Sequence, residues 1–365
     1  MPKIKEIITV LESLAPLAYA EDFDNVGLLV GDIETEASGV LICHDALESV
    51  VNEAIAKNCN LIVCFHPILF SGLKKITGKN YVERVVIKAI QNNIAIYAIH
   101  TALDNHQDGV NKLFCNAIEL INTKILIPKP NFIRKLVAYT VPENAEQVRN
   151  ALFGAGAGNI GNYENCSFSS QGKGTYKGNQ SSNPVIGNRY EFVESHEVKI
   201  EVTFEKHLEQ KIIKALFNAH IYEEVAYEIY SLENSHQNIG LGMIGELKTP
   251  MSEKELLLFV KQRMNAEGIR HSPFTGKTIH KVAVLGGSGS FAIKNAIAAG
   301  ADAFLTADLK YHNFYEAENQ LLLTDIGHFE SEQHTKNYIV DFLREKILNF
   351  AIVLSEENTN PVKYL

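Results

Sequence analysis

Apolar and polar positions follow two periods along the first 120 residues. Short apolar runs with branched side chains, typical of buried strands, lie at 39–45, 61–67 and 94–100. Segments with apolar residues three and four positions apart predict helices at 46–58, 82–93 and 109–120. Strands that alternate with helices predict crossover units and a mostly parallel sheet.

The pattern changes in the middle of the chain. The segment "INTKILIPKPNF" (121–132) carries two prolines and predicts a linker. From Arg134 to about Leu232 the order becomes strand, helix, strands, helix, strand, with a Ser/Gly/Asn-rich stretch at 166–188. This order is typical of an α+β module of ferredoxin-like type. The segment "NSHQN" (234–238) predicts the linker out of it.

Alternation resumes after this module. Strands are predicted at 281–290, 301–308 and 321–328, with helices between them and a closing strand at 349–357. The fold class is therefore α/β, interrupted by an inserted α+β domain. We expect an α/β domain whose first lobe is 1–128 and whose second, similar lobe is 238–365, with the insertion at 129–237.

Composition narrows the function classes. The chain has 365 residues, enough for two domains, and a formal net charge of −9. That charge disfavours nucleic-acid binding, which needs a concentrated basic face, and argues weakly against an anionic membrane surface. No apolar run reaches the length of a membrane span, and the N-terminal 17 residues predict an amphipathic helix instead of a signal peptide. Five scattered cysteines without a C-x-x-C pair predict free, mostly buried thiols and a cytoplasmic location.

Metal-capable side chains follow several of the predicted strands. They are His44, Asp45, His66, His100, Asp104, Asp308, Asp325 and His328. In open parallel sheets, ligands bind outside the carboxyl ends of the strands. The sequence therefore predicts a site at this edge.

His328 and Glu332 lie four residues apart in "GHFESEQH". If a helix begins near His328, the two side chains share one face and can hold one ion. Imidazole and carboxylate ligands suit zinc, iron, manganese or nickel without selecting among them. The alternative is a polar helix start, because acidic residues favour helix N-termini.

The other candidates have structural alternatives as well. His66 could be a strand-end histidine bonded to the backbone, His100 could support the "HTALD" loop, and Asp104 could cap the helix that follows "NHQDG". Metal binding accounts for His66, Asp104, His328 and Glu332 together better than four separate explanations do.

Two further motifs have two interpretations each. "GGSGS" (286–290) is either a tight strand–helix turn or a contact for an anion, and it lacks both the G-x-G-x-x-G pattern and a Walker lysine. Lys74, Lys75 and Lys79 lie either in a solvated loop or near an anionic substrate.

Six motifs together resemble one known family. "DFDNVGLLVGD", "FHPILFSGLKKI", "HTALDNHQDGVN", "VAVLGGSGS", "TADLKYH" and "DIGHFESE" occur in the order of the Nif-three-like family, the dinuclear-metal-centre proteins often labelled GTP cyclohydrolase I type 2 homologues. The inserted module resembles the CutA-like or P-two-regulator-like insertion of the longer members. The resemblance implies two similar α/β lobes facing each other across a two-metal cleft, in a ring-shaped homohexamer.

Carried onto this chain, the resemblance implies His66, Asp104, His328 and Glu332 as ligands of one or two divalent ions, zinc, iron or manganese. The family commonly has two consecutive histidines before the proline, and the first is Phe65 here. Phenylalanine cannot bind a metal, so one metal position loses a ligand unless Glu330, His100 or His44 compensates. This departure affects the second metal and not the first.

Two functions follow from this set of residues. The first is a metal-dependent hydrolase for a small phosphorylated or nucleotide-like substrate, in which a shared metal-bound water attacks and Glu330 or His100 moves a proton. The second is a non-enzymatic, oligomeric metal-binding regulator or partner-binding protein. The sequence alone does not decide between an enzyme and a regulator.

Overall fold

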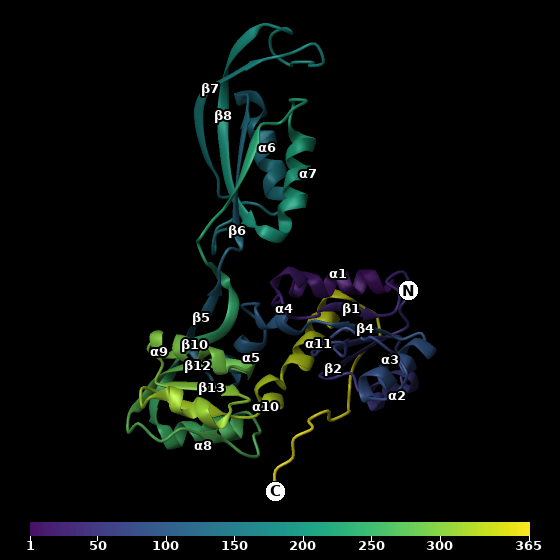
Figure 1. Ribbon diagram of the computed structural model, residues 1–365, viewed down its shortest axis with the longest axis vertical. Helices are drawn as coiled ribbons and strands as arrows, with labels where there is room; N and C mark the ends of the chain where they lie inside the picture. The colour runs from purple at the N-terminus through teal and green to yellow at the C-terminus, as the bar shows by residue number, and fades with distance from the viewer. The chain divides into compact units, whose positions relative to one another are not determined.

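A computed structural model describes all residues, 1–365, and divides them into two compact units (Figure 1). The first unit comprises Met1–Ile127 and Asn238–Leu365, and the second comprises Pro128–Gln237. Together they contain a five-stranded, a six-stranded and a four-stranded sheet with helices packed on them. The predicted mixed α/β class is confirmed.

The five-stranded sheet has the order β1-β4-β3-β2-β15. Its strands are β1 (Gly27–Val30), β2 (Val40–Cys43), β3 (Leu61–Cys64), β4 (Ala95–Ala98) and β15 (Ile352–Leu354). Four strands are parallel, and β1 is an antiparallel edge. Every residue of β2, β3 and β4 is buried, as expected for parallel strands covered on both faces.

Helices cover both faces of this sheet (Figure 1). One apolar cluster joins the strands to α1 (Ile4–Leu14) and α11 (Thr335–Lys346). The other joins them to α2 (Glu48–Ala56) and α3 (Tyr81–Gln91). The short helix α4 (His100–Asp104) follows β4 directly.

The six-stranded sheet has the order β11-β14-β13-β12-β10-β5. Its strands are β5 (Ile121–Lys129), β10 (His236–Ser252), β11 (Arg270–His271), β12 (Thr278–Ser288), β13 (Ala303–Ala307) and β14 (Leu322–Asp325). Its helices are α5 (Val110–Ala117), α8 (Glu253–Arg263), α9 (Ile293–Ala298) and α10 (His328–Glu332). Along β12, Val282 and Val284 pack with α8, whereas Ala283 and Leu285 pack with α9, which is the two-residue period of a strand.

Each of the two sheets of the first unit includes one strand from the opposite part of the chain. The C-terminal strand β15 pairs with β2, with Ile352 opposite Val40. In return, β5 from the N-terminal part lies at the edge of the six-stranded sheet, and Phe114 of α5 packs into its core. The C-terminal part of the chain thus completes the five-stranded sheet, and the N-terminal part completes the six-stranded sheet.

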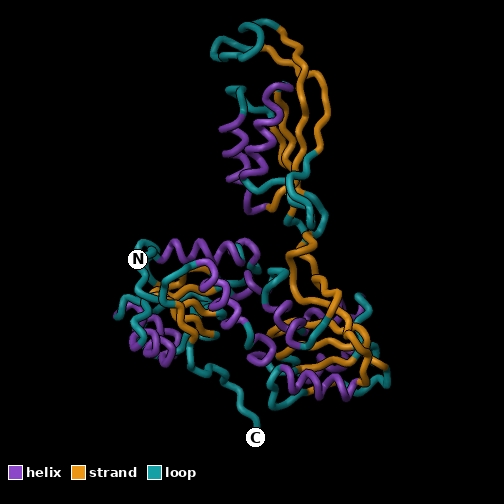
Figure 2. Tube along the Cα trace, turned by 180° about the vertical axis from the view of Figure 1, so that it is seen from behind, coloured by secondary structure: helices purple, strands orange, loops and turns teal.

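The second unit has the strand order β7-β8-β6-β9, and both of its helices lie on one face of the sheet (Figure 2). Its elements are β6 (Ile133–Thr140), α6 (Pro142–Gly154), β7 (Phe168–Lys177), β8 (Phe192–Glu205), α7 (Glu209–Ala219) and β9 (Tyr227–Ser231). The Ser/Gly/Asn-rich stretch contains β7, which pairs with β8 from Phe168 to Lys177 although most of its residues are exposed.

The two segments predicted as linkers are mostly strand. Residues 121–129 form β5, and β10 begins at His236. The boundaries between the two units, Ile127/Pro128 and Gln237/Asn238, fall within these segments, but strands make the connections instead of irregular linkers. Pro128 is compatible with a strand because it lies near the end of an edge strand, where a missing N–H donor is tolerated.

Two predictions from composition can be compared with the structure. All five cysteines are free and four are buried, which confirms the expected thiols. None of the helices combines the length and the apolar character needed to cross a membrane.

Candidate metal centre

The carboxyl ends of strands from two sheets carry the candidate side chains. His44 directly follows β2, His66 lies two residues beyond β3, and Asp308 directly follows β13. Helix α10 begins at His328, three residues after β14, so Glu332 lies one turn further on the same face. Parallel strands bring their ends to one edge, which is why residues far apart in sequence meet here.

Three imidazoles surround one carboxylate oxygen. Glu332 Oε2 lies 3.3 Å from His44 Nε2, 3.3 Å from His66 Nε2 and 3.2 Å from His328 Nε2. The two Nε2 atoms of His66 and His328 are 3.3 Å apart. Glu332 is buried, with 3 % of its surface exposed. The structure thus brings together a donor set of nitrogen and oxygen atoms from two sheets.

Carboxylates at the Nδ1 atoms orient two of these histidines. His66 Nδ1 lies 2.8 Å from Asp45 Oδ1, and Asp45 Oδ2 accepts a hydrogen bond of 2.6 Å from Thr359. His328 Nδ1 lies 2.7 Å from Asp308 Oδ2. A carboxylate on Nδ1 fixes the ring and turns Nε2 toward the centre, as in many metal sites.

Three buried polar atoms at this place have no hydrogen-bond partner. They are His44 Nε2, Glu332 Oε2 and Asp104 Oδ1. Unpaired buried polar atoms are costly and rare in folded proteins. A divalent cation would satisfy nitrogen and carboxylate oxygen donors together. The residues present therefore fit a metal ion.

The charges of the centre are strongly coupled. Burial would lower the pKa of His66, but its hydrogen bond with Asp45 and the negative charge of Glu332 raise it to about 9. Likewise, Asp308 and Glu332 outweigh burial and raise the pKa of His328 to about 11. Burial would raise the pKa of Glu332, yet the surrounding imidazoles hold it well below its usual range. Without a metal, protons on the imidazoles balance the buried carboxylate, and a cation would replace them.

Asp104 lies beside this group at the end of α4. Burial and the charge of Glu332 raise the pKa of Asp104 well above its usual range, while His66 and His328 act in the opposite direction. The alternative that Asp104 caps the next helix is wrong, because α5 begins at Val110 and its cap residue is Gly109.

The two candidates for proton transfer lie in different surroundings. The His100 ring is centred 5.1 Å from that of His66, and its Nδ1 is 2.9 Å from Asp24. Glu330 instead accepts a hydrogen bond of 3.0 Å from Asn360. Asp24 was missed as a positioning residue in the sequence, where only its place in "DFDNVG" signalled it.

The first two N–H groups of the glycine motif are already hydrogen-bonded within the protein. Its first residues belong to β12, and the N–H groups of Gly286 and Gly287 already donate to Asn111 Oδ1 at 3.0 Å and Ser331 Oγ at 2.8 Å. Lys74, Lys75 and Lys79 lie in an exposed loop. Neither motif therefore contributes a defined phosphate contact.

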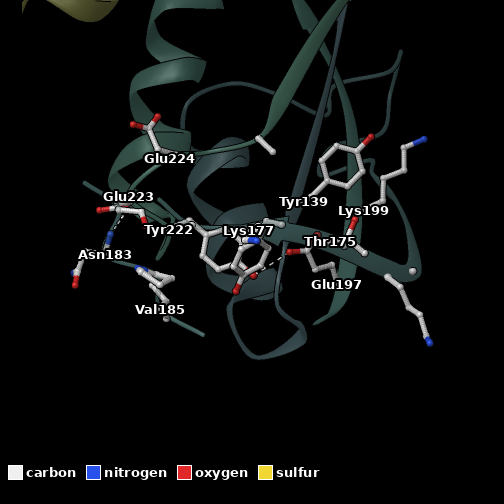
Figure 3. Close-up of a pocket in the computed structure, with 18 of the residues that line it drawn as sticks. Tyr139, Thr175, Lys177, Asn183, Val185, Glu197, Lys199, Tyr222, Glu223 and Glu224 are labelled. Carbon is white, nitrogen blue, oxygen red and sulfur yellow. Dashed lines mark hydrogen bonds between the residues drawn. The ribbon is translucent and has the colours of Figure 1, made fainter. Parts of the chain in front are cut away.

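A separate pocket of about 660 Å³ lies in the second unit (Figure 3). Charges of both signs line it, and Tyr222 donates to Glu197 at its wall over 3.0 Å. None of the histidines of the metal centre lines it.

Comparison with known proteins shows which family the chain is part of. The profile of the family described as Duf34/NIF3 (NGG1p interacting factor 3) matches residues 2–361. The chain belongs to the DUF34/NIF3 family. A member from Bacillus subtilis (strain 168), named "GTP cyclohydrolase 1 type 2 homolog", is 38% identical over 99% of this chain and 98% of its own length. The resemblance seen in the sequence motifs is confirmed.

Solved structures of similar proteins agree with the fold. A Bacillus cereus protein related to NIF3 superposes with a TM-score of 0.86 at 37% identity, covering 100% of this chain and 99% of that one. The Staphylococcus aureus protein SA1388 gives a TM-score of 0.80 at 27% identity over the same shares. The family fold therefore extends through both units.

Proposed function

We propose that this chain is a metal-dependent hydrolase of small phosphorylated or nucleotide-like substrates, with His66, Asp104, His328 and Glu332 as metal ligands. The observation that carries the proposal is the cluster of three imidazole nitrogens within 3.3 Å of Glu332 Oε2, next to partnerless buried acceptors. The word cyclohydrolase in the names of relatives supports the reaction class.

The residues at the centre would have different roles in such a reaction. His66 and His328 present Nε2 to the centre, because Asp45 and Asp308 hold their Nδ1 atoms. One or two zinc, iron or manganese ions bound there would lower the pKa of a water and polarise a substrate oxygen. Asp24 holds Nδ1 of His100 and leaves its Nε2 to take up or return a proton. Glu330, engaged by Asn360, is less suited to that role.

The finer architecture belongs to the same proposal. We assign 1–128 and 238–365 to two similar α/β lobes around a metal cleft, and 129–237 to an inserted ferredoxin-like domain. The strand order β7-β8-β6-β9 with two helices on one face supports the latter. The family resemblance supports a homohexamer with a dinuclear centre, and the free thiols support a cytoplasmic location.

A second function has specific support. Phe65 is fully buried beside the centre where a histidine is expected, and the second unit carries a pocket of its own. Both observations favour an oligomeric metal-binding regulator or partner-binding protein without turnover.

A substrate panel separates the two functions. We expect hydrolysis of at least one phosphorylated or nucleotide compound, GTP included, by protein loaded with zinc, iron or manganese. Asp104→Ala should abolish it, while Asp341→Ala, which removes an exposed acid on α11, should not. Circular dichroism would check that both variants fold. Metal binding without turnover of any compound would favour the regulator.

A further inference from the structure

Position 65 leaves an apolar ring inside a polar centre. Phe65 is fully buried, and its ring is centred 5.3 Å from that of His44 and 4.9 Å from that of His66. We propose that His44 is a metal ligand and supplies, from the neighbouring strand, the imidazole that Phe65 lacks. This inference rests on the metal-binding part of the proposed function.

The pairing of two strands explains how a histidine at position 44 can replace a histidine at position 65, although the two positions are 21 residues apart. Strands β2 and β3 are parallel, with Cys43 opposite Cys64. His44 and Phe65 are the next residues along each strand, and the N–H of Phe65 donates to the carbonyl of His44 over 3.1 Å. Residues at matching positions on neighbouring strands point to the same face, about 4.8 Å apart. An imidazole at either position therefore reaches the same space.

The hydrogen bonds around His44 fix which nitrogen faces the centre. Thr335 Oγ1 donates to the carbonyl of Glu332 over 2.6 Å, so its lone pairs remain for His44 Nδ1, which lies 3.5 Å away. Nδ1 is thus turned toward Thr335, and Nε2 is the nitrogen that faces the centre.

This nitrogen faces a buried carboxylate oxygen. His44 Nε2 and Glu332 Oε2 are 3.3 Å apart and buried, and neither has a hydrogen-bond partner. A divalent cation beside them would satisfy both atoms at once. Because His66 and His328 approach the same oxygen, that cation belongs to the same centre.

Packing alone does not explain a histidine at this place. His44 is 3 % exposed and lies against the rings of Phe65 and Phe329, where an aliphatic side chain would fill the space without an unpaired nitrogen. A metal ligand at His44 accounts for both its polarity and its burial.

The test measures metal content and zinc affinity of the full chain for four variants. They are His44→Leu, Phe65→His, the double variant His44→Leu/Phe65→His, and His334→Leu as a control. His334 also has a buried Nε2 without a partner, but it makes no contact with the centre that the structure shows. Elemental analysis and titration against a chelating dye give the number of ions per chain and the affinity for zinc.

We expect His44→Leu to lose one ion per chain or to weaken zinc binding roughly tenfold or more. The double variant should recover most of that loss, since the imidazole returns to the same space from the next strand. His334→Leu should match wild type. A His44→Leu variant with unchanged stoichiometry and affinity would overturn the assignment. If adding Phe65→His to His44→Leu does not restore zinc binding, the inference that His44 replaces a histidine at position 65 is overturned.

Two further measurements distinguish a ligand role of His44 from failure of the whole metal centre. X-ray absorption at the zinc edge counts imidazoles per ion, and in His44→Gln, which keeps a polar side chain, the count should fall. Unchanged counts contradict a ligand role. His328→Ala tests the centre as a whole: if that variant keeps its metal, the proposed function fails independently of His44.

Discussion

The two buried acids of the centre have opposite surroundings. Imidazoles on three sides stabilise the ionised form of Glu332, whereas burial and the charge of Glu332 raise the pKa of Asp104. Asp104 is thus favourable as a neutral group or beside a cation, and unfavourable as a free carboxylate. The balance between these residues, and not any one of them, points to a cation.

Asp104→Asn should therefore change the stability little without metal and lower it when zinc is bound. In chelator, the amide has nearly the size of a carboxyl whose charged form is disfavoured by burial, and the free energy of unfolding should change by less than about 1 kcal/mol. With free zinc at about 100 times Kd, the wild type should gain roughly 2.7 kcal/mol and the variant under about 1. Urea unfolding under both conditions measures this difference. An equal gain in the variant would exclude Asp104 as a ligand.

At the scale of elements, the end of β12 determines how closely the second sheet approaches α10. Gly287 has φ of 68°, and a Cβ there would lie 2.4 Å from Glu332 Oε1 and 3.5 Å from His328 Cε1. The glycine motif therefore serves to bring the strand close to two candidate ligands.

Gly287→Ala should displace Glu332 and weaken zinc binding roughly tenfold or more. It should also cost about 1–2 kcal/mol of stability, because alanine disfavours a left-handed backbone. Gly276→Ala separates these effects, since Gly276 has φ of 77° but a Cβ there would meet no atom within 4 Å. That control should lose stability and keep its zinc affinity. If both variants bind zinc like wild type, the close approach of β12 has no part in the centre.

At the scale of the molecule, the two units have separate cores. The apolar cluster of the second unit lies entirely within residues 136–219, and the clusters of the first unit use none of them. Strands β5 and β10 are neighbours, and Gly242 approaches Leu126 while Gly245 approaches Ile121, so the two strands run in opposite directions. A short turn can join them.

A chain lacking 128–237, with Ile127 joined to Asn238 by a short glycine-rich turn, should fold and keep the metal content of the full chain. The physical reason is that the centre and its supporting carboxylates all lie in the first unit. Thermal unfolding and elemental analysis measure both properties. Loss of cooperative unfolding would show that the first unit depends on the second.

Local patterns in the sequence were sufficient to predict the strand and helix alternation, the change of pattern in the middle, and the pairing of His328 with Glu332 on one helical turn. These features have short periods, so local spacing is sufficient to predict them. The exchange of β5 and β15 between sheets, and the approach of His44 to Glu332 across 288 residues (332 − 44), depend on packing between elements distant in sequence. Side-chain contact at that range is decided by how sheets and helices fill space, which no local pattern encodes.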